Sequence, residues 1–285
     1  MDVLPLSPFI AAEVQSLDVS AGLSDTELRQ VHDAWYEHLV LVFRGQTLSD
    51  EQLVRFSRQF GELEQAPIGE AANLTSDGNV PNLPEVNVVS NVIEDGIAIG
   101  GLGAGEAIWH TDMSYIPEPP TASLLYALEV PARGGDTSFI NMYEAFDALP
   151  DDLQHAVGRY NAKHDASHNS AGNLRKGFHP VTDVSQAPGA VHPMLRTHPE
   201  SGHKALYLGR RRNAYIVGLP VEESESTLDT IWQEMSHSAF TYTHQWQVGD
   251  LLLWDNRCTM HRRDAFASNA RRIMHRTQIK GDKPF

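Results

Sequence analysis

The stretch LLLWDNRCTMH at residues 251–261 runs from an apolar segment, Leu251–Trp254, to a histidine. The glycine turn Val248-Gly249-Asp250 precedes it, as is typical of the start of a β-strand. Four more short strand-like segments bounded by turn signals occur in the chain, namely Ser123–Val130, Asp136–Asn141, Lys204–Leu208 and Arg272–Ile279. Short strands at this spacing predict a sandwich or barrel of antiparallel strands.

Helical patterns flank these strands. Ser24 is followed three residues later by Glu27, and Ser49 is followed three residues later by Gln52. Both pairs have the pattern of a helix capping box. We expect the second of these helices to end at Gly61. A strand between them and two later helices are expected at Leu39–Phe43, Met142–Tyr160 and Val221–His237. The predicted fold class is therefore mainly β with flanking helices (α+β).

Composition limits the classes of function. The 285 residues are 41% hydrophobic and 21% charged, values typical of a globular chain, and no repeat or composition shift marks a boundary. We therefore expect one enlarged domain over residues 1–285. The formal charge of −15 is the wrong sign for a protein that holds a phosphate backbone, so nucleic acid is not an expected partner.

The chain has one cysteine, Cys258, which cannot form an internal disulfide. Residues Met1–Glu13 lack the basic and apolar regions of a signal peptide, and no apolar run reaches the roughly 18 residues of a membrane helix. These features predict a cytoplasmic protein without membrane contact. We also expect a homo-oligomer, either a dimer or a tetramer.

Residues 61–105 are rich in turn formers. Prolines and glycines are dense in this segment, and it has only one clear strand pattern, Glu85–Val92. We interpret 61–105 as an active-site lid, with the glycines of Gly96–Gly105 as its hinge.

The chemistry-bearing residues lie in two places. His110-Thr111-Asp112 places an imidazole and a carboxylate two residues apart, which on a strand would share one face. His261 offers a third ligand beyond the apolar strand. Two histidines and one carboxylate are typical of non-haem Fe(II) oxygenases, but catalytic zinc in a hydrolase uses a similar set. At this point both metals remain open.

The last strand distinguishes the two alternatives. Arg272 and Arg276 alternate with partly apolar residues, so both guanidinium groups are expected on one face. Arginine binds carboxylates bidentately and keeps its charge when partly buried. A pair of arginines beside a metal is suited to a dicarboxylate, which a zinc hydrolase does not need.

Five motifs together resemble the taurine/2-oxoglutarate dioxygenase family, which includes the phenoxyacetate herbicide dioxygenases and the alkylsulfatases. They are Trp109-His110-Thr111-Asp112, Gly134-Gly135-Asp136-Thr137, Trp254-Asp255-Asn256-Arg257, His261, and Arg271-Arg272-Ile273-Met274-His275-Arg276. The resemblance extends over nearly the whole chain. It implies a double-stranded β-helix, the jelly roll of cupin-like proteins.

The resemblance also implies roles for single residues. Fe(II) would be bound by His110, Asp112 and His261, which are then the catalytic residues. The cosubstrate 2-oxoglutarate would chelate the iron, while Thr137 and Arg272 hold its distal C5 carboxylate. The implied reaction uses dioxygen to hydroxylate a substrate and forms succinate and carbon dioxide. Because Asp112 is present, hydroxylation is favoured over halogenation.

Three further residues are expected to bind the prime substrate. Arg276 resembles the family arginine that meets an anionic group, and Tyr207 falls near aromatics that line the family's pocket. Glu106, four residues before His110, could oppose a cationic group. The prediction is a small organic anion or zwitterion: a sulfonate, a sulfate ester or a carboxylate.

Overall fold

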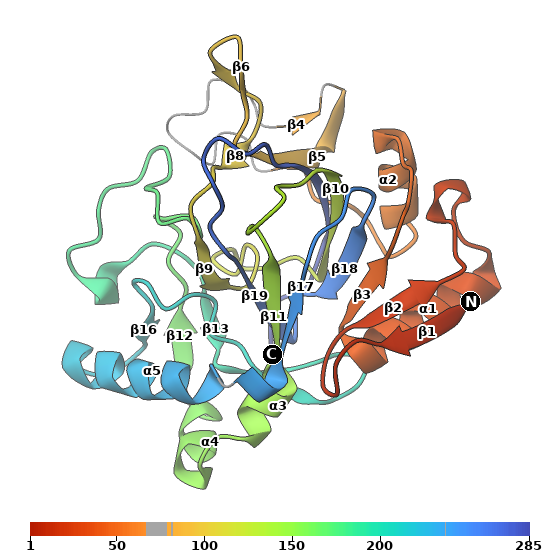
Figure 1. The fold of residues 1–285 in the computed structure, drawn as a ribbon. Helices are drawn as coiled ribbons and strands as arrows, with labels where there is room; N and C mark the ends of the chain where they lie inside the picture. The colour runs from red at the N-terminus through yellow and green to blue at the C-terminus, as the bar shows by residue number, and fades with distance from the viewer. Residues whose placement is uncertain (67–78, 81, 237) are drawn as a thin grey trace.

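The computed structural model describes residues 1–66, 79–80, 82–236 and 238–285. Its larger sheet has nine strands (Figure 1). In spatial order they are β1 (Asp2–Pro5), β2 (Ala12–Gln15), β3 (Val40–Phe43), β18 (Leu251–Asp255), β10 (Ala122–Glu129), β20 (Ile273–Ile279), β5 (Leu83–Ser90) and β4 (Asn79–Val80), with β8 (Gly101–Leu102) paired to β5. The second sheet has the order β17 (Thr241–His244), β11 (Thr137–Asn141), β19 (Thr259–Arg263) and β9 (Ala107–His110).

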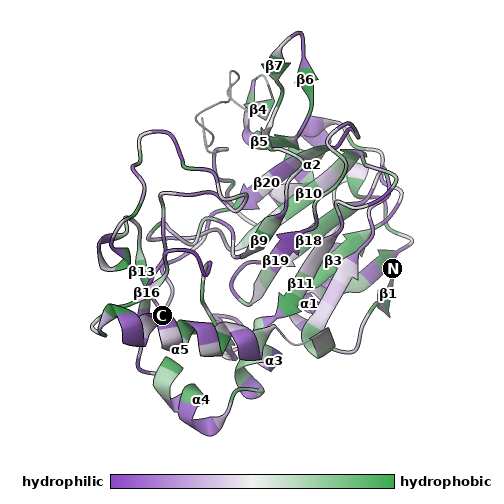
Figure 2. Cartoon of the chain, turned by 60° about the vertical axis from the view of Figure 1, so that its left-hand side comes forward, coloured by the Kyte–Doolittle hydropathy of each residue, from purple (hydrophilic) through white to green (hydrophobic). Residues whose placement is uncertain are grey.

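The two sheets enclose one apolar core. Leu125 and Trp254 of the larger sheet belong to the same buried cluster as Phe139 and Met260 of the smaller one. The rings of Phe139 and Trp254 lie 5.5 Å apart. Figure 2 shows β10 and β11 as largely hydrophobic, whereas much of β19 and β20 is hydrophilic. This is the predicted jelly roll, and its two hydrophilic strands border the candidate site.

The strand predictions are confirmed with small shifts at the ends. Most pairs are antiparallel as expected, although β2 pairs with β3 and β5 pairs with β8 in parallel. Shorter strands complete the molecule: β13 (Val191–Pro193), β12 (Asn161–Lys163) and β16 (Tyr215–Ile216) in one sheet, β14 (Leu195–Thr197) with β15 (Lys204–Leu206), and β6 (Ile93–Glu94) with β7 (Ile97–Ala98).

Two helices pack beside the larger sheet, and three lie together at one end of the molecule (Figure 1). They are α1 (Asp25–His38), α2 (Asp50–Ser57), α3 (Met142–Asp147), α4 (Asp151–Val157) and α5 (Val221–Met235), with the short 3-10 helices η1 (Val19–Ala21), η2 (Val184–Gln186) and η3 (Ser238–Phe240). Both predicted capping boxes are present, at Ser24 with Glu27 and at Ser49 with Gln52. Trp35 of α1 and Phe56 of α2 pack in one buried cluster with strand residues of the larger sheet.

Two helix predictions were wrong in extent. Helix α2 ends at Ser57 rather than at Gly61. The predicted helix Met142–Tyr160 is divided into α3 and α4 at Pro150, because proline lacks a backbone N–H and disfavours helical conformation in the residue before it. The last predicted residue of α5, His237, lies outside the described residues.

The predicted lid segment is only partly described, because residues 67–78 and Pro81 lie outside the described ranges. Its strand β5 is a member of the larger sheet and pairs with β20. The hairpin β6–β7 projects from the molecule, and Gly96 in its turn has a φ of 80° (Figures 1 and 2). A closing motion of the lid stays a prediction. Within the described ranges, no helix has the length and apolar character needed to cross a membrane.

Candidate active site

Pairing of β9 with β19 brings the two candidate histidines together. The backbone register matches His110 with His261, and their ring centroids lie 4.2 Å apart. The Nε2 atoms of His110 and His261 lie 3.6 Å and 3.8 Å from Oδ1 of Asp112. Ligand atoms of all three residues lie within 4.8 Å of one another, which is close enough for a single metal ion to contact each.

Asp112 reaches this position in a different way from the one predicted. Strand β9 ends at His110, so the two residues do not share one face of a strand. Asp112 lies in the following turn, where Met113 has a left-handed φ of 46°. The turn bends the chain back and returns the carboxylate toward the His110 ring.

Buried hydrogen bonds fix the orientation of the Asp112 carboxylate. Its Oδ2 accepts from Ser123 Oγ at 2.7 Å and from Gln278 Nε2 at 3.2 Å. Its Oδ1 faces both imidazoles and accepts from Arg276 Nη1 at 3.1 Å. Burial opposes ionisation of Asp112, but the charge of Arg276, together with the neighbouring His261, outweighs it and holds the pKa well below its usual range. The carboxylate is therefore ionised.

The Trp254-Asp255-Asn256-Arg257 motif is connected to the Asp112 carboxylate by a chain of hydrogen bonds. The Trp254 indole donates to Asn256 Oδ1 at 2.8 Å, and Asn256 Nδ2 donates to Ser123 Oγ at 2.9 Å. Ser123 then donates to Asp112. Such outer hydrogen bonds are what orients a metal ligand in known sites.

Hydrogen bonding and burial orient the two imidazoles for metal binding. His110 Nδ1 lies 2.7 Å from the Ile108 carbonyl, which accepts only, so Nδ1 carries the proton and Nε2 offers its lone pair. Burial, with His110 nearby, lowers the pKa of His261 to about 3. Two imidazole nitrogens and an ionised carboxylate are a donor set that fits a divalent cation. In this structure the Arg276 guanidinium supplies the positive charge beside Oδ1.

Next to the triad, a second cavity contains buried positive charge. Thr137, Arg263 and Arg272 line it together with apolar residues of the larger sheet. Arg272 is 2% exposed, and among the described residues no carboxylate lies within ion-pair distance of its guanidinium. Burial, and then the charge of Arg263, lowers the pKa of Arg272 to about 9. A buried guanidinium with no described carboxylate in direct contact fits the distal carboxylate of 2-oxoglutarate.

Trp246 organises this cavity. Its indole N–H donates to Thr137 Oγ1 at 2.9 Å, so the hydroxyl proton of Thr137 is left to donate elsewhere. The Arg272 guanidinium lies over the Trp246 ring, 5.8 Å from its centroid. Arg263 donates to the carbonyls of Leu102, Gly103 and Gly105, which ties the glycine-rich segment to the cavity wall.

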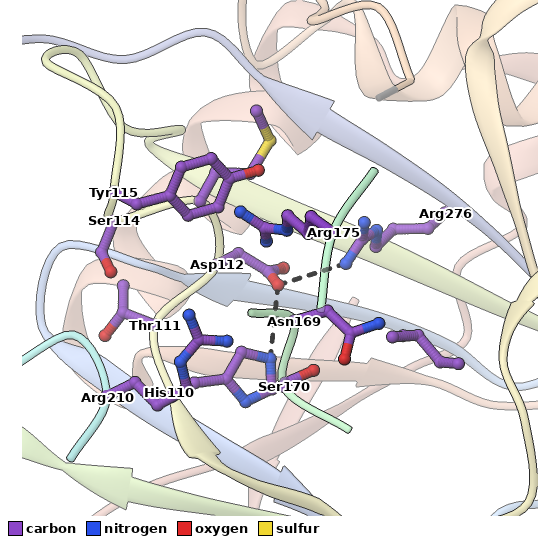
Figure 3. Close-up of a pocket in the computed structure, with 12 residues that line it drawn as sticks. His110, Thr111, Asp112, Ser114, Tyr115, Asn169, Ser170, Arg175, Arg210 and Arg276 are labelled. Atoms are coloured by element: carbon purple, nitrogen blue, oxygen red, sulfur yellow. Dashed lines mark hydrogen bonds and ion pairs between the residues drawn. The ribbon is translucent and has the colours of Figure 1, made fainter. Parts of the chain in front are cut away.

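The cavity in front of Asp112 is polar (Figure 3). Arg175, Arg210 and Arg276 contribute three guanidinium groups to its lining. Figure 3 shows Arg175 and Arg276 near Asp112, with Arg175 against the ring of Tyr115.

Two of the predicted substrate residues lie elsewhere. The exposed Glu106 carboxylate is 3.7 Å from Arg262 Nη1 and does not line either described cavity. Tyr207 is 1% exposed and stacks on His164, behind the cavity surface. The structure therefore brings together the triad, Thr137, Arg272 and Arg276, but not Glu106 or Tyr207.

A second group of potential ligand atoms, His198, Asp255 and Cys258, has another use. Both Asp255 oxygens bind Arg257, and Oδ2 also contacts His198 Nε2 at 3.0 Å. Burial raises the pKa of the Cys258 thiol well above its usual value, which keeps it protonated. This group is an internal ion-pair network.

Sequence reasoning missed several residues of the site. Ser123 is the one serine of a largely apolar strand, a signal that could have been noticed. Gln278 lies on the predicted face of Arg272 and Arg276 and follows from that alternation. Nothing in the local sequence connects Arg175 with the site.

Comparison with known proteins agrees with this geometry. The family model "Taurine catabolism dioxygenase TauD, TfdA family" matches residues 2–278. The alpha-ketoglutarate-dependent (2-oxoglutarate-dependent) 2,4-dichlorophenoxyacetate dioxygenase of Cupriavidus pinatubonensis is 35% identical over 98% of this chain and 97% of that protein. The alpha-ketoglutarate-dependent sulfate ester dioxygenase of Pseudomonas putida is 28% identical over 100% and 91%.

Solved structures show the same relationship. The structure of AAD-2 in complex with Mn(II) and N-oxalylglycine has a TM-score of 0.79 at 30% identity, and the match covers 99% of this chain and 98% of that one. A taurine dioxygenase from Burkholderia xenovorans has a TM-score of 0.78 at 31% identity, with 99% and 90% covered. The chain therefore belongs to the TauD/TfdA family and is an Fe(II)- and 2-oxoglutarate-dependent dioxygenase, a non-haem iron oxidoreductase.

Proposed function

We propose that His110, Asp112 and His261 hold the iron of this dioxygenase. The proposal is supported by their shared position, their protonation states and the hydrogen bonds that fix Asp112. Iron(II), 2-oxoglutarate and dioxygen together supply the oxidising power that hydroxylates a C–H bond, with succinate and carbon dioxide as coproducts. A zinc hydrolase built on the same residues finds no support in the two relatives described above, which are named as dioxygenases.

Arg272 and Thr137 bind the C5 carboxylate of 2-oxoglutarate in this proposal. The guanidinium supplies a charge-assisted fork, and Thr137 donates the hydroxyl proton that Trp246 leaves available. Both groups lie in the cavity that also contains His261, so a bound cosubstrate lies between the arginine and the metal ligands. Apolar residues of the same cavity, such as Leu125 and Trp254, limit the access of water.

The prime substrate is a small organic anion. The three guanidinium groups in the cavity in front of Asp112 are the observation that carries this proposal. The named activities of the relatives agree, since they include dioxygenases of a phenoxyacetate and of a sulfate ester. Glu106 is exposed and paired with Arg262, which gives zwitterion recognition little support.

A substrate screen tests the proposal. Sulfonates, sulfate esters, carboxylates and matched neutral alcohols are compared for stimulated release of succinate, and products are identified by mass spectrometry. We expect anions to stimulate and Arg276→Gln to reduce the stimulation. Preferred turnover of a neutral compound, unchanged in Arg276→Gln, would contradict an anionic substrate.

The remaining proposals concern the context of the enzyme. A single domain agrees with the family match over residues 2–278. The single cysteine favours a cytoplasmic location, and the net charge of −15 disfavours nucleic acid as a partner. A homo-oligomer, dimer or tetramer, can be tested by light scattering of the purified protein.

A further inference from the structure

The two cavities of the site meet beside His110. The cavity in front of Asp112 and the cavity that contains Arg272 share four lining residues, namely Leu102, His110, Ser170 and Arg276. Of these four, Leu102 is the aliphatic one. It lies in β8, which pairs with β5 (Figure 1). The position of the Leu102 side chain therefore affects the space next to His110 in both cavities.

Leu102 has a backbone conformation that leucine rarely adopts. Its φ is 75°, in the left-handed region, where the Cβ atom crowds the backbone. The next residue, Gly103, has a φ of 53°, which glycine adopts at little cost because it has no Cβ. Strained residues of other types persist only where their surroundings fix them, and they cluster at functional sites. Other contacts must therefore hold Leu102 in this conformation.

Arg263 supplies such contacts from one side. Its Nη1 donates to the Gly103 carbonyl at 3.0 Å. Its Nη2 donates to the Leu102 carbonyl at 3.3 Å and also to the Gly105 carbonyl. Arg263 is 6% exposed, so these hydrogen bonds are shielded from water. Hydrogen bonds from a charged donor are stronger than neutral ones, and three of them converge on one short turn.

The other side of the segment packs on β5. A Cβ atom on Gly100 would lie 2.4 Å from the carbonyl oxygen of Val88, so only glycine fits at this point without a shift of the backbone. The parallel pairing of β8 with β5 follows directly after it. Leu102 is therefore held between β5 and the Arg263 guanidinium.

Arg263 also belongs to the metal and cosubstrate part of the site. It lies two residues after His261 in β19, and the register places it opposite Thr137 in β11. It lines the cavity that contains Arg272. Burial lowers the pKa of Arg263 to about 10, so the guanidinium is still charged at neutral pH. One side chain thus connects the strand of a predicted metal ligand with the turn that carries Leu102.

We propose that Leu102 determines which substrates fit beside the metal site, and that Arg263 is the positioning residue that holds Leu102 there. Because Leu102 and Arg276 both lie where the cavities meet, an anionic group at Arg276 brings the adjacent carbon atoms against Leu102. The preferred substrate is then an anion whose carbon chain is unbranched close to the charged group. The inference rests on the proposed function, since it concerns the shape of the anion that the same site accepts.

Isomeric anions that differ in width test the proposal. Hexanoate and 3,3-dimethylbutanoate have the same charge and composition, and so do hexyl sulfate and 3,3-dimethylbutyl sulfate. Hexanol is the neutral reference. Dissociation constants are measured by calorimetry on the Fe(II) enzyme saturated with 2-oxoglutarate, without oxygen. Saturation keeps any effect on cosubstrate binding out of the comparison.

The parent enzyme should bind the linear isomers more tightly than the branched ones. Leu102→Ala should shift the ratio of the two dissociation constants about tenfold or more toward the branched isomer, the effect expected from removing apolar bulk at a packed contact. Arg263→Gln should shift the ratio in the same direction. Arg263→Lys should keep the parent ratio within about threefold, because an ammonium group can also donate to the carbonyls.

Two variants serve as matched controls. Ile97→Ala removes an exposed aliphatic side chain from the hairpin of the same segment. Arg262→Gln changes the neighbouring arginine of β19, which pairs with Glu106 and Asp264. Ile97 and Arg262 line neither of the two cavities. Both variants should keep the isomer ratio of the parent.

Two measurements on the metal-free protein show whether Arg263 acts through the turn. The Phe266 backbone N–H donates to the Ala104 carbonyl at 3.1 Å, and its hydrogen exchange should be about tenfold or more faster in Arg263→Gln than in the parent or Arg263→Lys. Leu102→Gly should melt roughly 1–4 °C above Leu102→Ala, because glycine adopts a positive φ without strain.

The outcomes separate this inference from the proposed function. Equal binding of linear and branched isomers by the parent, an unchanged ratio in Leu102→Ala, or an equal shift in Ile97→Ala overturns Leu102 as the specificity-determining residue. An unchanged ratio or unchanged Phe266 exchange in folded Arg263→Gln overturns the positioning role of Arg263. Leu102→Gly that melts no higher than Leu102→Ala overturns the strain at this residue. Hexanol bound more tightly than all four anions overturns the anionic substrate itself.

Discussion

Replacing Arg272 with methionine should stabilise the protein and abolish cosubstrate binding together. The Arg272 guanidinium is 2% exposed and has no ion-paired carboxylate among the residues described, while Arg263 lies close enough to oppose its charge. Methionine has similar length, is flexible and needs no counter-ion, so it can fill the space beside Trp246. The variant therefore removes an electrostatic cost and a binding group in one step.

The lowered pKa of Arg272 indicates the order of magnitude of that cost. A fall in the pKa of Arg272 from 12.5 to about 9 corresponds to about 5 kcal/mol of destabilisation of the charged form. At neutral pH the arginine is protonated in both the folded and the unfolded protein, so the whole cost is present there. Replacing buried charged groups by apolar ones typically stabilises by 1–4 kcal/mol. We expect an increase in that range, or roughly 2–8 °C in Tm.

Binding of 2-oxoglutarate should change in the opposite direction. Two charge-assisted hydrogen bonds contribute about 3 kcal/mol or more, so the dissociation constant should rise about 100-fold or more. In the parent enzyme, 2-oxoglutarate at 100 times its dissociation constant adds about 2.7 kcal/mol of stability. That gain should be absent in Arg272→Met.

Calorimetric unfolding of the metal-free protein and anaerobic titration of the Fe(II) protein measure the two effects. Arg272→Lys is the charge-retaining control and should not stabilise. Arg271→Met tests the neighbouring exposed arginine, which pairs with Glu129 and Glu94, and should change stability by no more than about 0.5 kcal/mol. Two results would refute this reasoning. If Arg272→Met lowers the stability of the metal-free protein, the buried charge of Arg272 carries no net cost. If the variant binds 2-oxoglutarate as tightly as the parent does, Arg272 does not bind the cosubstrate.

Four other changes have defined outcomes. Asp112→Asn should abolish Fe(II)-dependent succinate release. It should also lower the free energy of unfolding by about 3–5 kcal/mol, because Arg276 loses its buried counter-ion. Retained turnover in a metal-loaded sample would show that Asp112 is not a required metal ligand. Trp246→Phe should weaken 2-oxoglutarate binding about 2–10-fold by titration through loss of one hydrogen bond to Thr137, and unchanged affinity would argue against this positioning role. Burial, and then the charges of His192 and Arg210, lowers the pKa of His164 far below 6.5, so the free energy of unfolding should fall as the pH drops below 6.5. In unfolding curves measured at acid pH, His164→Phe should reduce that slope by up to about 1.4 kcal/mol per pH unit. Equal slopes for the variant and the parent would contradict this prediction. Hydrogen exchange in Gly96–Gly105 should slow when substrate and 2-oxoglutarate bind together, whereas equal exchange would reject the lid.

Local signals in the sequence were sufficient for most of the fold. Serine capping boxes and alternating or apolar runs depend on neighbours within a few residues, and the helices after Ser24 and Ser49 and the strand β18 formed as expected. Pro150 was also a local signal, because a proline ends a helix, but the apolar pattern on both sides of it suggested one continuous helix. The resemblance to a known family then supplied the pairing of distant strands, which local patterns do not contain.

The site was harder to predict wherever it depends on distant contacts. Asp112 sits on a turn rather than a strand, and the hydrogen bond from Ser123 joins two segments that become neighbours only in the folded sheets. Arg175 reaches the cavity through a long connection whose sequence has no periodicity. Glu106 is close to His110 in sequence but points to Arg262 at the surface, because proximity along the chain does not determine where a loop side chain lies.

The buried arginines connect the stability of this enzyme with its function. Arg263, Arg272 and Arg276 come from two neighbouring parts of the chain, are each less than one-tenth exposed, and face the metal and cosubstrate cavities. Arg263 is held by backbone carbonyls and Arg276 by the metal ligand Asp112, so neither brings a carboxylate of its own. A fold selected for stability alone would place apolar side chains at these positions. Among the described residues, Asp112 is the one carboxylate in direct contact with these three cations. The anionic cosubstrate and substrate therefore complete the charge balance when they bind, and their binding should raise the free energy of unfolding.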